Sequence, residues 1–174
     1  ELNMKPSRQK MTLVGKTLVQ DNLLDVSGTI TRPQGIVHKP DGKMFVVTKI
    51  GTSTDPQNRI LYAFAGSTPW DASSMSLVGQ SSQLDKLPAE VNTGFNDITS
   101  ENGLDWYCVI DGNNIHQYRG TKPWDVTSIG TSIIATYSVS GQSGNELGLC
   151  VTGKHLFYTN NAASPNGLLR CLNI

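Results

Sequence analysis

A hexapeptide that occurs twice constrains the fold of this chain more than any other feature of its sequence. Gly66–Asp71, which reads GSTPWD, returns as Gly120–Asp125, which reads GTKPWD, so the two tryptophans lie 54 positions apart. Each copy follows a short run that ends in an aromatic residue and precedes a second apolar run. These flanking runs are 60–64 and 75–80 for the first copy, and 115–118 and 133–142 for the second. Similarity at a fixed spacing predicts a repeat architecture built from one supersecondary unit.

A tight turn followed by a strand-like run also recurs, upstream of each hexapeptide and once more near the end of the chain. The turns KPDGK, ENGL and TGK lie at 39–43, 101–104 and 152–154, and the runs that follow them lie at 44–48, 106–110 and 155–159. Asp-Gly and Asn-Gly between apolar runs are strong hairpin signals, because glycine accepts the positive φ that tight turns need. A further run precedes each turn, at 35–38, 95–99 and 147–151. Strand-length runs separated by turns, without helical periodicity, predict an all-β fold.

The repeats predict a single domain over 1–174, with units at about 30–80, 92–142 and 145–174. Each complete unit contains four strands, whereas the last unit ends in its third strand, at 168–174. Residues 10–16, KMTLVGK, closely match 74–80, SMSLVGQ, which form the fourth strand of the first unit. We therefore expect residues 10–16 to supply the missing fourth strand and to close the array.

These units resemble the propeller-type repeats of many bacteriophage structural proteins and some bacterial surface proteins. The matching pieces span most of the chain: Lys39–Val47, Pro69–Ser73, Ile115–Tyr118, Pro123–Ser128 and Tyr137–Gln142. The second unit departs from the pattern, with ENGL in place of the Asp-Gly-Lys turn. The resemblance implies a β-propeller-like fold of three four-stranded antiparallel blades and a virion-like setting, and it transfers no catalytic residue.

Three blades are fewer than the four to eight of a β-propeller, and they would leave sheet faces and edges open. We expect a homodimer that forms one six-bladed ring, in which the strand Met11–Val14 of each copy completes the last blade of the other. Another homo-oligomer, a pseudo-threefold β-prism or β-trefoil monomer, and a fragment of a longer propeller remain alternatives. The chain begins at Glu1 without an apolar signal-peptide core, so either a removed leader or a longer parent chain is expected.

The repeated signature Pro69-Trp70-Asp71 and Pro123-Trp124-Asp125 has a structural and a functional interpretation. In the structural one, proline fixes φ, tryptophan packs between units and aspartate accepts hydrogen bonds from backbone amides in the turn. In the functional one, tryptophan stacks on a sugar ring beside a carboxylate acceptor. Recurrence at the same place in both units favours a structural corner. Trp106, on a central strand, is predicted to belong to the core.

The cysteines Cys108, Cys150 and Cys171 are odd in number and show no metal-binding spacing. Cys150 falls on the first predicted strand of the last unit and Cys171 on the third. Strands two apart in a sheet lie about 10 Å apart, beyond the reach of a disulfide. All three are therefore predicted to be small buried thiols.

The sequence offers weak candidates for catalysis or metal binding. His38, His116 and His155 occupy different points of their units, so we expect none of them to be a ligand. Propeller lactonases hold a metal with carboxylate and amide side chains near the ring axis, where Asn96, Asp97 and Glu146 would fall; metal-assisted hydrolysis is a minor alternative. No cofactor and no catalytic residue are predicted.

Composition narrows the class of function. Lysine and arginine together number 14, as do aspartate and glutamate, and charged residues make up 16% against about 25% in an average soluble protein. This balance gives no reason to expect binding to nucleic acid or to an anionic membrane surface. No run in the sequence approaches the ~18 apolar residues that a membrane helix needs, so we do not expect membrane insertion. We expect a non-enzymatic virion or extracellular structural or adhesion protein, such as a phage decoration, fibre or tail-associated protein. Its partners would be other virion proteins or surface glycans. A secreted or surface carbohydrate-binding lectin is the alternative.

Overall fold

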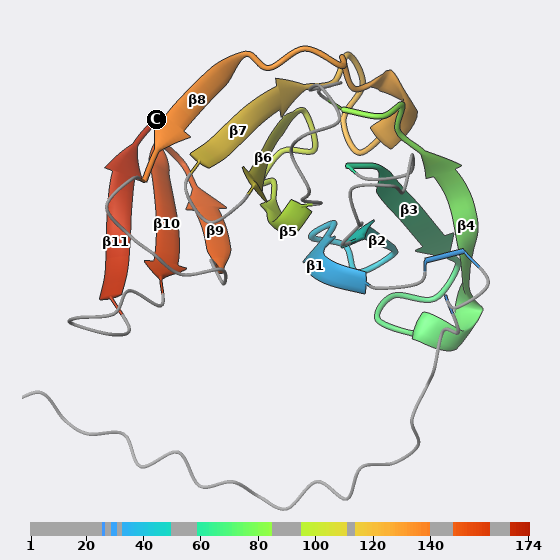
Figure 1. The fold of residues 1–174 in the computed structure, drawn as a ribbon. Helices are drawn as coiled ribbons and strands as arrows, with labels where there is room; N and C mark the ends of the chain where they lie inside the picture. The colour runs from blue at the N-terminus through green and yellow to red at the C-terminus, as the bar shows by residue number, and fades with distance from the viewer. Residues whose placement is uncertain are drawn as a thin grey trace, which may run out of the picture.

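The computed structural model describes residues 26, 29, 30, 33–49, 59–84, 95–110, 114–139, 148–160 and 168–174. In this part the chain is all-β, with three antiparallel sheets and two single turns of 3₁₀ helix. Each sheet is a meander in which strands consecutive in sequence lie side by side, as the closely spaced hairpins predict (Figure 1).

Sheet 1 contains β1 (Pro33–His38), β2 (Met44–Lys49), β3 (Leu61–Gly66) and β4 (Met75–Gln80), in the order β1-β2-β3-β4. The predicted runs are confirmed to within a few residues. Gly42 turns the first hairpin at a φ of 70°, a conformation in which other residues are strained.

Sheet 2 repeats this pattern with β5 (Phe95–Thr99), β6 (Asp105–Ile110), β7 (Asn114–Arg119) and β8 (Ala135–Ser138), again in consecutive order. The strand β8 begins two residues after the start of the predicted run 133–142, of which residues 140–142 lie outside the described residues. The described residues before it, 131–134, are bends and irregular backbone. Two apolar residues in sequence, Ile133 and Ile134, therefore did not mark the start of a strand.

Sheet 3 contains β9 (Leu149–Thr152), β10 (His155–Asn160) and β11 (Leu168–Asn173), in the order β11-β10-β9. Cys150 lies in β9 and Cys171 in β11, as predicted. The described part of the chain supplies no fourth strand beside β11. Residues 10–16, which are predicted to fill that place, lie outside the described residues.

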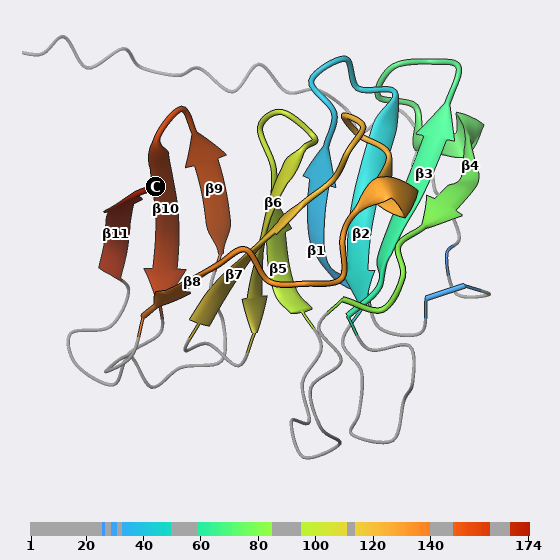
Figure 2. The same ribbon diagram turned by 90° about the horizontal axis from the view of Figure 1, so that it is seen from above.

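The three sheets lie side by side along an open arc, with their first strands β1, β5 and β9 on the concave side (Figure 1). The view from above shows the same order of the sheets (Figure 2). The strand β1 contacts β5, and β5 contacts β9, so the first strands form a continuous inner row.

The apolar core is divided between the sheets. One cluster joins Val46, Leu61 and Ala63 of sheet 1 to Phe95, Ile98, Trp106 and Cys108 of sheet 2. A second cluster joins sheet 2 to sheet 3, and a third covers the remaining face of sheet 1. Because strand residues alternate between faces, sheet 2 presents one apolar set to sheet 1 and another to sheet 3.

Candidate functional site

The two Pro-Trp-Asp corners have the same backbone geometry. Proline occupies the second position of a turn, and the tryptophan after it has a φ of 63° at Trp70 and 60° at Trp124. A positive φ at the third position, with proline before it, is the pattern of a type II turn, which normally takes glycine there. Trp70 N–H donates to the Gly42 carbonyl at 2.8 Å, and Trp124 N–H donates to the Gly103 carbonyl at 2.9 Å. Each corner is thus bonded to the first hairpin of its own sheet.

The aspartates of the two corners cap short 3₁₀ turns, η1 (Ala72–Ser74) and η2 (Val126–Ser128). The Asp71 carboxylate accepts from the backbone N–H and hydroxyl of Ser73 at 3.0 and 2.6 Å, and Asp125 accepts from Thr127 at the same distances. The hydrogen bond from the Thr127 side chain is the main cause that lowers the pKa of Asp125. The structural interpretation of the aspartates is confirmed, whereas the 3₁₀ turns were not predicted.

The two tryptophan rings have opposite exposure. Trp124 is 9% exposed and makes an edge-to-face contact with Trp106, with ring centroids 5.7 Å apart and an interplanar angle of 77°. Trp70 stands at the same angle to Phe45, with centroids 6.2 Å apart, but it is 57% exposed. The prediction that tryptophan packs between units is therefore right for Trp124, whereas the described residues leave Trp70 open.

Sheet 1 covers the Trp124 corner. A small cavity of about 150 Å³ lies between them, lined by Met44, Ala63 and Gly79 of sheet 1 and by Trp124 and Val126 of the corner, among others. A Cβ atom added to Gly79 would lie 3.0 Å from Cγ2 of Thr127, so the corner approaches the β4 backbone closely. This junction buries Trp106, Ile98 and Cys108 to 1% exposure or less.

Hydrogen bonds between first strands hold sheet 2 against sheet 3. Asp97, Thr99 and Glu101 alternate along β5 and the turn after it. Their side chains accept from the backbone N–H groups of Leu149, Val151 and Gly153, at 2.7, 3.3 and 2.7 Å respectively. Three side chains of one chain segment thus bond to three alternate amides of the next. We call this set the β5–β9 ladder.

Of the three residues considered as metal ligands, Asp97 has a structural role. Its Oδ1 accepts from the Ile98 amide at 2.8 Å and its Oδ2 from the Leu149 amide. Burial raises the pKa of Asp97, and these two hydrogen bonds offset only part of that effect. Asn96 lies beside it in β5, while Glu146 falls outside the described residues.

The histidines do not converge. His38 lies against Trp70 at 4.9 Å between ring centroids, His116 is buried near Tyr118, and His155 bonds to Asn173 at 3.0 Å. Within the described ranges, no three His, Cys, Asp or Glu side chains gather as metal ligands do. In the same part of the chain, no helix has the length and apolar character needed to cross a bilayer.

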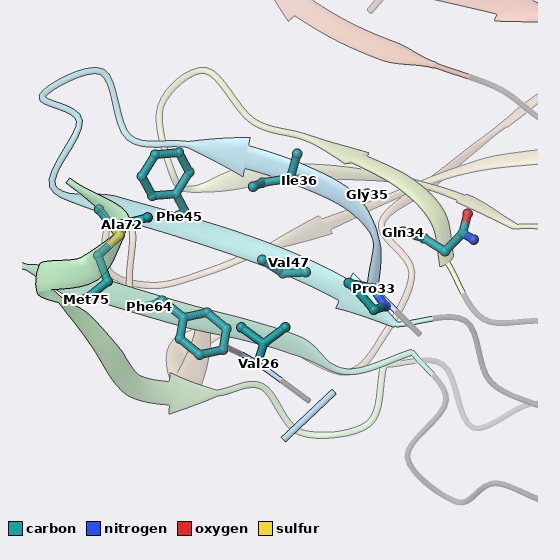
Figure 3. Close-up of a pocket in the computed structure, with 10 residues that line it drawn as sticks. All are labelled: Val26, Pro33, Gln34, Gly35, Ile36, Phe45, Val47, Phe64, Ala72 and Met75. Carbon is teal, nitrogen blue, oxygen red and sulfur yellow. The ribbon is translucent and has the colours of Figure 1, made fainter. Parts of the chain in front are cut away.

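The face of sheet 1 that points away from sheet 2, here called the open face, is hollowed. Figure 3 shows Ile36, Phe45, Val47 and Phe64 lying on it, with Ala72 and Met75 at one side. The hollow has a volume of about 440 Å³, and none of the residues that line it is charged. Ile36 is 60% exposed, an unusual value for an isoleucine beside other apolar residues. Val47, Phe64 and Met75 are buried and form one cluster with Ile30 and Val26, so the face is partly covered and Ile36 is its strongly exposed apolar residue.

In the part of the chain that the structure describes, no sheet covers the face of sheet 3 that points away from sheet 2, here called the outer face. Phe157 pairs across the strands with Cys150 on one side and Cys171 on the other. The prediction of three buried thiols is right for Cys108 and wrong for Cys150 and Cys171, which are exposed free thiols. The physical reason is that sheet 2 covers only one face of sheet 3, and both cysteines lie on the other. Leu169 nearby is 68% exposed.

No family model matches the sequence of this chain, and a search of the curated proteins finds no match either.

Proposed function

We propose that this chain is a non-enzymatic structural or adhesion protein of a virion or cell exterior, built as three blades of a β-propeller that an assembly completes. The observation that carries the proposal is that, within the described residues, no further sheet lies over the end face of sheet 1 or over the end face of sheet 3. A protein that assembles with other copies needs end faces that a partner can cover, whereas catalysis gives no reason for such faces.

The order of strands supports a propeller. Each sheet is a meander, the first strands lie side by side on the concave side of the arc, and each sheet packs face to face on the next. These are the relations between blades around a propeller axis. They favour a propeller over the β-prism and β-trefoil alternatives, in which sheets or hairpins are arranged around a threefold axis.

The edge of sheet 3 supports completion by another strand. In sheets 1 and 2 a fourth strand, β4 or β8, lies beside the third, whereas β11 has a described neighbour only in β10. Unpaired strand edges attract further strands. We assign residues 10–16 to this place, either in the same copy or in a partner.

Low charge and the resemblance of the repeats to phage and bacterial surface proteins support the extracellular or virion setting. Stable assembly through apolar faces also suits a particle that is built once and must persist. No cofactor is needed for this role.

A carbohydrate-binding lectin is the second candidate, and the exposure of Trp70 favours it. An exposed indole can stack on a sugar ring, although the neighbouring Asp71 carboxylate already accepts from Ser73. A glycan array separates the two candidates. Binding that is lost in Trp70→Ala, with the circular dichroism spectrum unchanged, would favour the lectin. No binding to any glycan on the array would favour the scaffold.

The mass in solution tests the assembly directly. Light scattering or analytical ultracentrifugation of the 174-residue chain should give a multiple of 18.8 kDa at micromolar concentration. A mass of one chain at every concentration reached would contradict the proposal.

A further inference from the structure

We infer that the outer face of sheet 3 docks on the open face of sheet 1 in a second copy of this chain, with Cys171 of one copy facing Ala72 of the other. This inference rests on the proposed assembly and specifies which surfaces form it. Two such contacts, related by a twofold axis, would close a ring of six sheets.

The junction between sheets 1 and 2 shows what covers an open face. Ile98 pairs with Cys108 in sheet 2, and Ile36 pairs with Val47 in sheet 1. Cys108 follows the hairpin glycine Gly103 at the same distance as Val47 follows Gly42, so Ile98 and Ile36 occupy equivalent positions in their sheets. Ile98 is 1% exposed because sheet 1 lies over it, whereas Ile36 is 60% exposed.

The aromatic corner repeats the same contrast. Phe45 and Trp70 occupy the positions of Trp106 and Trp124 and form the same edge-to-face pair. In sheet 2 the pair is buried under the preceding sheet. The open face therefore has the residues of a junction but lacks a covering sheet in the described part of this chain.

The junction between sheets 2 and 3 is formed in the same way. Leu156 and Tyr158 of β10 pack against Tyr107, Val109 and Ile115 of sheet 2. The same kind of contact thus occurs twice among the described residues. In sheets 2 and 3, the face that corresponds to the open face of sheet 1 is covered by the opposite face of the preceding sheet. The outer face of sheet 3 is the opposite face that is left uncovered within the described residues.

Positions in the outer face correspond to those of the first junction. Phe157 follows Gly153 at the same distance as Val46 follows Gly42, and it pairs with Cys171 as Val46 pairs with Ala63. Ala63 lines a cavity together with Val126, the first residue of η2.

The first residue of η1 is Ala72, which lines the hollow of the open face. Cys171 in the closing junction would consequently take the place of Ala63, and Ala72 the place of Val126. The exposed thiol and the corner of the second copy would then lie side by side.

A second copy suits these faces better than an unrelated partner. The hollow has no charged lining, so a surface that covers it should bring no charged side chain. The outer face presents Phe157, Leu169 and the two thiols beside the polar side chains of His155 and Asn173. Two copies give six sheets, within the four to eight of known propellers, and a head-to-tail contact that closes forms a ring.

The test is a disulfide across the proposed contact. The full chain with Ala72→Cys is oxidised with copper phenanthroline and run on a non-reducing gel. We expect a covalent dimer that dithiothreitol reverses and that disappears when Cys171→Ser is added. The matched control is Ile134→Cys, because Ile134 is 52% exposed and lies on neither face. A yield of dimer no higher than that of the control or of the wild-type chain would overturn the inference.

A second variant gives a readout that does not depend on a disulfide. Ile36→Lys places a charge in the hollow, where it would be buried only in the assembly. We expect the dissociation constant of the dimer to rise about a hundredfold or more, measured by analytical ultracentrifugation, with the circular dichroism spectrum unchanged. Ile134→Lys should change it by less than about threefold, because surface substitutions cost little.

The outcomes separate this inference from the proposed assembly. A stable oligomer that neither forms the disulfide nor responds to Ile36→Lys would show that other surfaces meet, and the inference would fail alone. A chain that remains a monomer would remove both.

Discussion

Replacement of the hairpin glycines by alanine gives the sharpest test of how the corners are held. Gly103 and Gly153 both turn the first hairpin of their sheets with positive φ, at 71° and 55°. A Cβ atom on Gly103 would lie 2.5 Å from Cδ1 of Trp124 and against the Trp124 backbone nitrogen, whereas at Gly153 it would meet nothing within 4 Å. The two substitutions therefore share the cost of the backbone conformation and differ in the steric cost.

The magnitudes follow from these two terms. Alanine in the left-handed region costs about 1–2 kcal/mol in either variant. The overlap with the Trp124 corner should add about 1–3 kcal/mol in Gly103→Ala alone, because well-packed groups must move apart. The entropy that alanine removes from the unfolded chain is the same in both and cancels in the difference.

The assay is urea denaturation of both variants and the wild type, followed by circular dichroism. We expect Gly103→Ala to lose about 1–3 kcal/mol more than Gly153→Ala, with the same dependence on urea. Equal losses would refute the steric argument and would mean that the corner yields without cost.

Three further predictions concern the corners and the β5–β9 ladder. At dilute protein concentration, Trp124→Ala should lower the free energy of unfolding by about 3–5 kcal/mol and Trp70→Ala by about 1 kcal/mol, since only the first ring is buried; thermal and urea unfolding measure both, and equal losses would argue against the described junction. Asp125→Ala should cost about 0.5–2 kcal/mol through loss of the cap, and Asp125→Asn should restore much of it, as the same unfolding curves would reveal. Burial raises the pKa of Asp97 above its ordinary value of 3.8, so the folded protein holds this proton more tightly than the unfolded chain. This tighter proton binding should stabilise the folded protein in full below pH 3.8, and the stabilisation should be lost as the pH rises through the raised pKa. In Asp97→Asn the unfolding free energy should lack this pH-dependent part. The same pH profile in the variant and the wild type would contradict the prediction.

Much of the fold could be predicted from the sequence because its signals are local. Asp-Gly and Asn-Gly mark hairpins through the conformational freedom of glycine, and short apolar runs between turns mark strands. The corner aspartates were also predictable, since a short acceptor side chain after a turn bonds to nearby amides. Placement of Cys150 and Cys171 on the first and third strands of the last unit followed from the same repeat pattern.

The rest depends on which sheet covers which face, and no local pattern records that. Trp70 and Trp124 have almost the same neighbours in sequence, yet one is exposed and the other buried, because among the described residues a sheet lies in front of Trp124 and none lies in front of Trp70. Exposure of Cys150 and Cys171 was missed for the same reason. The acceptors Thr99 and Glu101 gave no signal, since their partners are backbone amides 52 positions away.

The β5–β9 ladder has a consequence for how such a chain can change over generations. One side of it is made by side chains, but the other side is made by main-chain amides, which every residue except proline provides. Substitutions at Leu149 and Val151 therefore keep the hydrogen bonds as long as proline is avoided. Gly153 is also held by its positive φ, and Asp97, Thr99 and Glu101 are held to acceptor side chains. Such one-sided recognition allows duplicated units to drift apart in sequence while they still fit their neighbours.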